Sequence, residues 1–393
     1  MPVSIQLESD QVGKREDLSD LIATADRKNT PFYNQVPKGA IPKNVVFQWQ
    51  MDKYNDPVAD TAKVSDSAGA AALLGTSSVV DGTDHATTGD VFAETRTRKL
   101  AQNYVHTFEK ATRIGFLAED VSTVAGAPSE LARSVARRIV EMKREIEKHM
   151  MSGSNAIDQV SDAGHNKTGY KTKALGSYIH ENGKSTAGGT EASTFTVDDA
   201  FQPTAGTGST AAGIYTGAIG SFSEEVVQNM LEGIYNATGT ARDYTGIVGT
   251  TLKRKFTNLA STNTVTSTIQ HTADPTGTGN PPGTELSAYP GIAADRTRTV
   301  TKDQASRSYV SSIDIFSGDF GEITLLPSHF TDHASNGYII PFDEVSLKIH
   351  TAPNVSELTN NGGGEARLLR AIMGLAVNNP LSFGRFRSDS THA

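Results

Sequence analysis

The sequence predicts an α+β fold arranged around one long helix. Three patterns support this prediction: helical spacing over residues 128–151, two alternating strand patterns over residues 44–52 and 95–108, and a helix, strand and helix between residues 221 and 259. The chain has 393 residues, of which 37% are hydrophobic, so it can form a substantial core. Its 36 glycines and 15 prolines indicate that much of the remainder is loop or short strand.

Composition excludes several classes of protein. The absence of cysteine excludes disulfides, thiolate chemistry and zinc sites built on thiolates, and it is compatible with a reducing cytoplasm. A formal charge of −8 argues against a protein that coats nucleic acid, because phosphate binding needs a basic face. The N-terminus lacks the pattern of a secretory signal, and no apolar run approaches the ~20 residues that span a bilayer. We therefore expect an intracellular product with no membrane segment.

The N-terminal residues form an arm in this interpretation. Residues 1–12 are polar, and residues 14–25 then place Leu18, Leu21 and Ile22 at the spacing of a short helix. Residues 29–33 interrupt that helix and supply two aromatic side chains that need a docking surface.

The two alternating patterns predict the strands of an extended hairpin. Phe47 and Trp49 share one face of the first strand, and Arg96 and Arg98 share one face of the second. About 40 residues rich in Ala, Gly, Ser, Thr and Asp connect them and contain few apolar side chains. Because a two-stranded hairpin is marginal in isolation, we expect it to lie on a neighbouring copy of the chain.

The long helix is amphipathic. Its apolar stripe is spaced by three or four residues and consists of Leu131, Val135, Ile139, Met142, Ile146 and Met150. The other faces are charged, with Arg137 four residues before Glu141 and Lys143 four residues before Glu147. At about 1.5 Å per residue, 24 residues extend roughly 36 Å. The helix begins near Pro128 with either Ser129 or Ala127 as its cap, and it ends at residues 152–155.

The second half of the chain alternates between elements and low-complexity stretches. We expect a strand at 175–180, a loop or insertion over 183–221, and a helix opened by a capping box from Ser221 to Glu224. Phe256 marks a further helix after a strand at 245–248, and a second insertion covers 261–298. A hairpin over 309–327, strands at 338–341 and 345–349, and a final apolar strand over 366–377 complete the prediction.

No motif in the chain predicts catalysis. Gly183, Lys184 and Ser185 resemble the end of a phosphate-binding loop, but Tyr178 stands where that motif requires glycine. His329 and His333 have a spacing used by metal ligands on helices, yet they follow Pro327 in a probable inter-strand loop by pattern. Nucleophile-elbow and thiol signatures are absent. We therefore expect no catalytic residue, cofactor or metal, and a structural protein in place of an enzyme.

Several segments resemble tailed-bacteriophage major capsid proteins. Residues 15–22 (REDLSDLI), 30–32 (TPF) and 47–52 (FQWQMD) are similar, in this order, to the opening segments of that family. Residues 141–147 (EMKREIE) resemble a family segment on a long helix, and residues 319–321 (DFG) followed by 326–330 (LPSHF) resemble a later one. The resemblance covers most of the chain, departs from the family pattern at the two Gly/Thr/Ser-rich insertions, and marks a fold without marking catalysis.

The resemblance implies an HK97-like capsid fold. Mapped onto this chain, it gives an N-terminal arm at 1–40, an extended β-hairpin loop at 41–108, and a peripheral domain at 109–180 with the spine helix at 128–151. The C-terminal strand at 365–393 completes the peripheral domain. An axial α/β domain occupies 181–360 and carries the insertions near 183–221 and 261–298.

The same resemblance implies the function. We expect a major capsid protein that assembles with copies of itself into pentamers and hexamers, closing an icosahedral shell around packaged DNA without sequence-specific binding. The location would be the virion, after assembly in the bacterial host cytoplasm. Portal, scaffold and decoration proteins are further partners that the resemblance admits.

Eight residues are candidates for subunit interfaces. We expect Phe47 and Trp49 to be buried against a neighbour, and Arg96 and Arg98 to pair with acidic groups. On the spine helix, the candidates for contacts between subunits or with the shell interior are Arg133, Arg137, Arg144 and Lys148. The alternatives are a nanocompartment shell of the encapsulin type, which shares this fold and holds a protein cargo, a tail-tube or decoration protein, and an enzyme with an unrecognised site.

Overall fold

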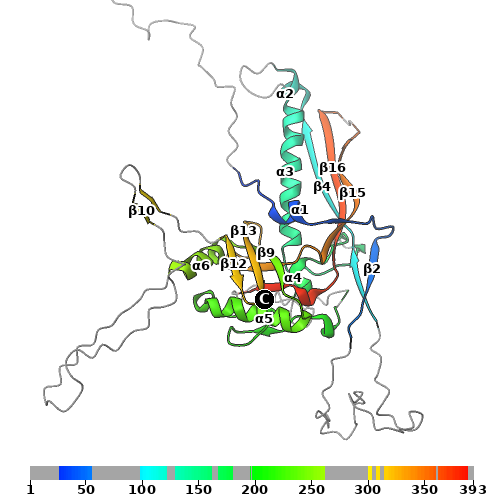
Figure 1. The fold of residues 1–393 in the computed structure, drawn as a ribbon. Helices are drawn as coiled ribbons and strands as arrows, with labels where there is room; N and C mark the ends of the chain where they lie inside the picture. The colour runs from blue at the N-terminus through cyan, green and yellow to red at the C-terminus, as the bar shows by residue number, and fades with distance from the viewer. Residues whose placement is uncertain are drawn as a thin grey trace, which may run out of the picture.

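The protein consists of a long helix on a narrow sheet at one end and a wider sheet with two helices at the other (Figure 1). This computed structural model describes residues 26–54, 98–121, 129–161, 167–179, 195, 197–261, 300–302, 307–309, 314–359 and 362–387. The predicted helix at 14–25, the connection within the hairpin and the insertion at 261–298 therefore lie outside the described residues, as does Arg96.

The long helix, α3, extends from Glu130 to Met150. Its cap is Ser129, whose hydroxyl accepts a hydrogen bond from the backbone N–H of Ala132 at 3.2 Å, which decides between the two predicted caps. The apolar stripe lies where the spacing predicts, but its burial is uneven. Met142, Ile146 and Met150 are fully buried, whereas Val135 and Ile139 near the N-terminal half are only partly covered.

A four-stranded sheet lies along α3 (Figure 1). Its order is β1 (Lys38–Gly39), β15 (Val345–Glu357), β16 (Glu365–Val377) and β4 (His106–Ile114). Strands β15, β16 and β4 pair antiparallel, and the short β1 pairs parallel with β15. Gly362, Gly363 and Gly364 connect β15 to β16 with φ of 90°, 82° and 136°, a conformation that favours glycine.

The hairpin strands pair as predicted, although the second strand is divided. Strand β2 (Val46–Met51) pairs antiparallel with β3 (Lys99–Tyr104), which sets Phe47 opposite Asn103. The predicted strand over 95–108 is not continuous: β3 ends at Tyr104, and β4 begins at His106 in the sheet beneath α3. The hairpin is therefore joined directly to the sheet that supports the long helix.

The wider sheet has seven strands among the described residues. Its order is β12 (Ile315–Gly318), β13 (Gly321–Pro327), β9 (Arg242–Val248), β14 (Gly337–Ile340), β17 (Gly384–Phe386), β8 (Ile214–Tyr215) and β7 (Ala205–Gly206). Helices α5 (Glu224–Thr238) and α6 (Thr250–Ser261) pack on one face through a shared apolar cluster that includes Ile234, Phe256 and Ile323. The predicted helix, strand and helix are thus present.

One continuous core joins the two sheets. The opposite face of the wider sheet contributes Ile247 and Ile340 to the cluster that contains Ile146 and Met150 of α3. The C-terminal end of α3 consequently lies where both sheets meet. Close packing at this position fixes the two sheets relative to each other.

The remaining described elements are short. They are α1 (Pro31–Gln35), α2 (Phe116–Asp120), α4 (Leu175–Tyr178) and the strand pairs β5 (Val160–Ser161) with β6 (Lys167–Thr168) and β10 (Val300–Lys302) with β11 (Arg307–Tyr309). Helix α2 lies at the N-terminal end of α3, where Glu119 accepts a hydrogen bond from the backbone N–H of Leu131 at 3.2 Å.

Two predictions about local structure are wrong. The predicted strand at 175–180 is the buried helical turn α4, because a short apolar run fits a buried helix as well as a buried strand. The predicted capping box at Ser221 is also wrong: Ser221 ends a 3₁₀ turn, and Ser223 immediately precedes α5. No side-chain hydrogen bond caps α5.

The sheets divide the chain differently from the predicted domains. Part of the predicted insertion at 183–221 belongs to the wider sheet, since it forms β7 and β8 and buries Phe201. Strand β15, assigned to the axial domain, lies in the sheet beneath α3. Strand β17, assigned to the peripheral domain, lies in the wider sheet. The chain therefore crosses between the two sheets more often than its linear order indicates.

The arm is attached to α3 through a buried carboxylate. Glu147 accepts hydrogen bonds from the backbone N–H groups of Phe32 at 3.0 Å and Tyr33 at 2.7 Å, at the start of α1. Burial raises the pKa of Glu147 from its ordinary value of 4.5 to about 7, although the two backbone N–H groups act in the opposite direction. Glu147 was expected to pair with Lys143 on the surface, and it instead lies in the core with an exposure of 0%.

Replacing Ile146 by alanine should destabilise the unassembled subunit by about 2–5 kcal/mol, because a fully buried side chain at the junction of both sheets would leave a cavity. Denaturant unfolding followed by circular dichroism measures this loss. Lys143→Ala, on the exposed side of the same helix, is the matched control and should change stability by less than about 0.5 kcal/mol. Equal effects of the two changes would contradict the assigned core.

The Glu147 carboxyl should make stability depend on pH. The folded state keeps a proton that the unfolded state releases above pH 4.5, so this group contributes most below pH 4.5. Its contribution falls as pH rises from 4.5 to about 7 and is level above that. Glu147→Gln removes the titration, so the stability difference between wild type and variant should change by about 3 kcal/mol across this window. Parallel stability profiles in denaturant titrations would refute the assignment.

Candidate assembly interface

The base of the hairpin is fixed to the body by Asn103, which is fully buried. Its amide N–H groups donate to the carbonyl of Leu375 at 2.6 Å and to that of Lys173 at 3.3 Å. Its carbonyl accepts from the backbone N–H of Lys173 at 2.7 Å and of Tyr104 at 2.8 Å. One side chain thus ties β3, β16 and the segment before α4 together, with every polar atom satisfied.

Phe47 and Trp49 face this chain's own core. Their rings stack with centroids 5.8 Å apart, and the indole N–H of Trp49 donates to the carbonyl of Val377 at 3.1 Å. Gly374 is required here, because a Cβ would lie 2.5 Å from the Phe47 ring. Both aromatics therefore anchor the hairpin internally, and their expected role at a subunit interface stays a prediction.

Ionisable side chains between α3 and its neighbours are kept uncharged by burial. The rings of His106 on β4 and His149 on α3 approach within 3.4 Å, and burial lowers the pKa of His106 to about 3. Burial also lowers the pKa of His149, whose ring nitrogen lies 3.0 Å from the Thr172 carbonyl, and it lowers the pKa of Lys173 to about 7. This part of the molecule is a packed joint with no solvent-exposed chemistry.

The exposed charges lie on the hairpin and on α3. Arg98 is 3.7 Å from Asp52 on the opposite strand, and both side chains are mostly exposed. Arg144 pairs with Asp26 of the arm at 2.5 Å and lies over the ring of Phe330 at 5.6 Å. These two arginines consequently have partners within the chain.

The other candidates on α3 differ in their surroundings. Arg133 pairs with Glu130 at 3.2 Å, and Arg138 pairs with Glu141 at 2.6 Å, the carboxylate that the spacing assigned to Arg137. Arg137 and Lys148 are exposed and have no ion pair within the described part of the chain. Interface roles for Arg133, Arg137, Arg144 and Lys148 stay predictions.

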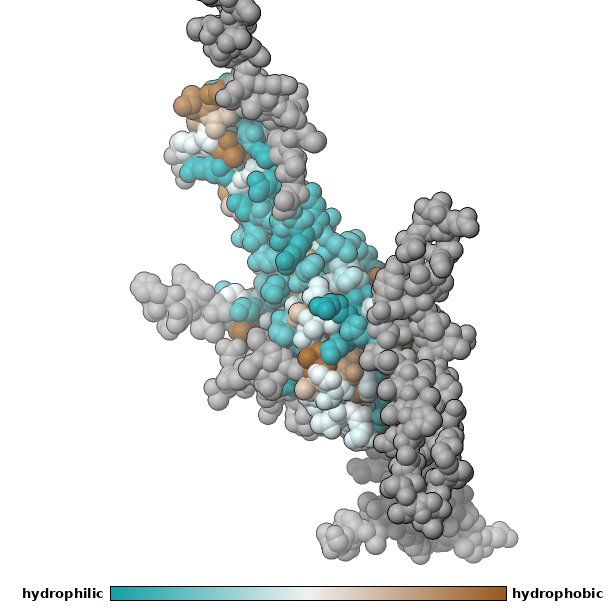
Figure 2. Space-filling view, turned by 90° about the vertical axis from the view of Figure 1, so that its left-hand side faces the viewer, coloured by the Kyte–Doolittle hydropathy of each residue, from teal (hydrophilic) through white to brown (hydrophobic). Residues whose placement is uncertain are grey.

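Exposed apolar side chains gather at the far end of the long helix. Figure 2 shows hydrophobic atoms at the free end of a column that is otherwise hydrophilic. Helix α2 provides Phe116 and Leu117, and Val121 follows it, with Leu117 78% exposed. Elsewhere Ile41 and Leu100 are also exposed. Apolar surface of this kind is typical of a contact with another protein.

Sites for small-molecule chemistry were examined in the same residues. The described segments contain no group of three or more histidine, aspartate or glutamate side chains arranged to hold a metal ion. Within them, no helix combines the length and apolar character needed to cross a membrane. Sequence reasoning missed Asn103 and Glu147. The available signals were an asparagine opposite Phe47 on an inward face, and Met151, which extends the buried stripe toward Glu147.

Solved capsid structures share this fold. The capsid subunit of cyanophage A-1(L) matches with a TM-score of 0.55 and 13% identity, covering 97% of this chain and 98% of that one. A chain from Mycobacterium phage Bobi and one from the capsid of a native GTA particle each match with a TM-score of 0.50 and 11% identity, covering 96% of both chains. These similarities support the predicted HK97-like fold. No curated protein sequence matches this chain.

The sequence itself matches the family described as SU10 major capsid protein over residues 5–280 and 282–389, which is nearly the whole chain. The fold, the absence of a catalytic arrangement among the described residues and this match agree with one another. The chain belongs to the SU10 major capsid protein family and is a structural component of the virion, forming the head shell of a tailed bacteriophage.

Proposed function

We propose that the subunit assembles head to tail with copies of itself into pentamers and hexamers, and that these close an icosahedral shell around packaged DNA. In this arrangement the hairpin of each copy lies on its neighbour. Contacts between unlike surfaces that close on themselves generate such rings. The shell would enclose DNA without sequence-specific binding, consistent with the net charge of −8.

One observation carries the proposal: the hairpin is rigid at its base and uncovered beyond it. Asn103 and Trp49 fix β2 and β3 to the core, while Leu100 on β3 is 50% exposed. A strand pair held in this way can present its outer residues to a second molecule with little loss of conformational entropy on binding. The exposed apolar end at α2 supplies a second, different surface, as head-to-tail assembly requires.

Other partners follow from the same proposal. A closed shell that takes up DNA needs an entry vertex, so a portal protein is a partner, and scaffold and decoration proteins stand beside it as predictions of the resemblance. The family match favours a phage head over a nanocompartment with a protein cargo.

Replacing residues 55–97 by an Asn-Gly turn should abolish shell formation without unfolding the subunit, because β2 and β3 end opposite each other at Met51 and Lys99. Electron microscopy and sedimentation of wild type and variant give the readout, and circular dichroism verifies the fold. Wild type should form rings or shells, and the variant should remain unassembled. Wild type that stays monomeric under all assembly conditions, or a variant that forms normal shells, would overturn the proposal.

A further inference from the structure

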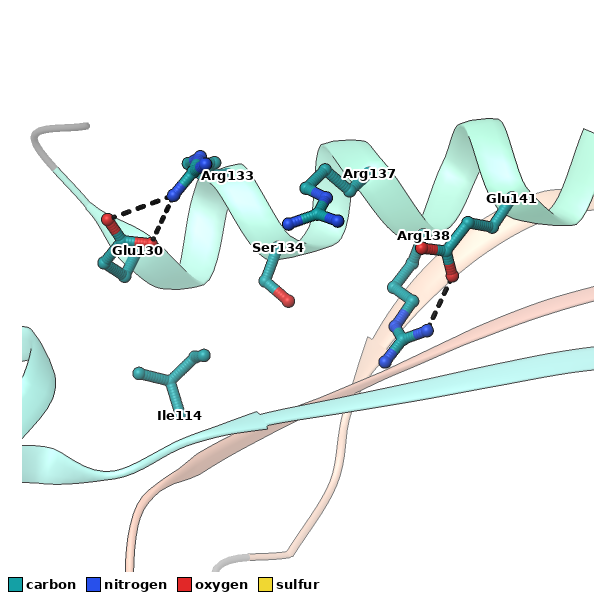
Figure 3. A pocket seen from close by; sticks show the side chains of 7 residues that line it. All are labelled: Ile114, Glu130, Arg133, Ser134, Arg137, Arg138 and Glu141. Carbon is teal, nitrogen blue, oxygen red and sulfur yellow. Dashed lines mark hydrogen bonds and ion pairs between the residues drawn. The ribbon is translucent and has the colours of Figure 1, made fainter. Parts of the chain in front are cut away.

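A hollow of about 240 Å³ lies between the N-terminal half of α3 and the end of β4 (Figure 3). Ile114 of β4 lies on its sheet side, and Ser134 of α3 points toward it. The helix side carries charged groups: Glu130, Arg133, Arg137, Arg138 and Glu141. The hollow is therefore a polar site bounded by one helix face and one strand end.

The charges of this hollow do not balance. Glu130 pairs with Arg133 at 3.2 Å, and Glu141 pairs with Arg138 at 2.6 Å. Arg137 lies between the two pairs along the helix and has no carboxylate partner in the described residues, since its expected partner is taken. Three guanidinium groups against two carboxylates leave one positive charge, so the hollow is one anionic group short of neutrality.

A carboxylate suits this position. A guanidinium binds a carboxylate through two parallel N–H···O hydrogen bonds, and such pairs are stronger than neutral hydrogen bonds. The volume of about 240 Å³ has room for an acidic side chain together with water.

The chain's own sequence offers a matching acidic segment. Residues 55–97, which connect β2 to β3, contain seven acidic and two basic residues, namely Asp56, Asp60, Asp66, Asp81, Asp84, Asp90 and Glu94 against Lys63 and Arg96. The strands that carry this segment are attached beside the C-terminal end of α3, whereas the hollow lies at the N-terminal half (Figure 1). This geometry favours a segment from a second copy.

We propose that the hollow at Arg137 is an acceptor site for a carboxylate from residues 55–97 of a second copy of this chain. The proposal rests on the proposed function and adds to it the residue that receives the hairpin. It also separates Arg137 from Arg133 and Arg144, whose partners lie within the chain.

Charge reversal tests the acceptor site. Arg137→Glu should raise the protein concentration needed for half-maximal shell assembly by about tenfold or more, because like charges would meet in the hollow. Lys143→Glu is the matched control, since Lys143 is exposed on the same helix and outside the hollow, and it should change that concentration less than about twofold. Circular dichroism and thermal unfolding of the unassembled subunits should be the same for both variants.

Crosslinking identifies the occupant directly. Arg137→Lys keeps the charge and introduces an amine that carbodiimide joins to a contacting carboxylate, whereas the guanidinium of wild type does not react. Shells assembled from equal amounts of ¹⁴N and ¹⁵N subunits distinguish links within a copy from links between copies by mass spectrometry. The expected product joins the introduced amine to an acidic residue of 55–97 on a second copy.

The outcomes are distinguishable from those for shell formation itself. If wild type forms shells and Arg137→Glu assembles as readily as Lys143→Glu, the acceptor site is refuted while the shell function stands. A link only to Glu130 or Glu141 of the same helix, a link to any other segment, or no link in intact shells also refutes it. If wild type forms no shell, the proposed function fails and the acceptor site fails with it.

Discussion

The burial of the C-terminal half of α3 is the constraint on which the rest of the structure depends. Met142, Ile146 and Met150 are fully buried in a core shared by both sheets. Fully burying a side chain of this size contributes about 1.5–3 kcal/mol, and removing one also leaves a cavity. The polar groups beside this stripe make the attachments: Glu147 holds the arm, and His149 meets β4. Asn103 then joins the hairpin to the same region.

The two ends of α3 consequently have different roles. At the C-terminal end, burial keeps His106 and His149 neutral, so the joint resists rearrangement near neutral pH. At the N-terminal end, the helix touches the sheet less closely and carries ion pairs and an unpaired arginine at the surface. A subunit with a rigid body and distant, differently built contact surfaces is suited to repeated assembly into a closed shell.

Much of this architecture could be predicted from sequence because strong periodicity determines it. The spacing from Leu131 to Met150 located α3, and alternation around Trp49 located the hairpin. What could not be predicted depends on long-range contacts. The division of the 95–108 run at Val105 follows from pairing with β16, a strand more than 250 residues later. The burial of Glu147 depends on the N–H groups of α1, and a glutamate among surface charges gave no local sign of it.

The candidate surface was predictable in outline and not in detail. The charged faces of α3 were visible in the sequence, but an i,i+4 rule assigned Glu141 to Arg137, whereas the rotamers pair it with Arg138. Phe47 and Trp49 were identified as contact residues, yet the strands β16 and β2 bring them onto the chain's own backbone at Val377 and Gly374. Side-chain choice among several partners is a property of the packed state.

Hydrogen–deuterium exchange of unassembled subunits and intact shells, resolved by residue, tests the central claim most directly. A rigid body with separate assembly surfaces predicts equal protection in both states for the amides from Met142 to Met150 and for those that bond to Asn103. Assembly should add protection at the outer strands of the hairpin, at α2 and along the N-terminal half of α3. Large gains in protection across the C-terminal half of α3 would contradict the account, because they would show that this core forms only on assembly.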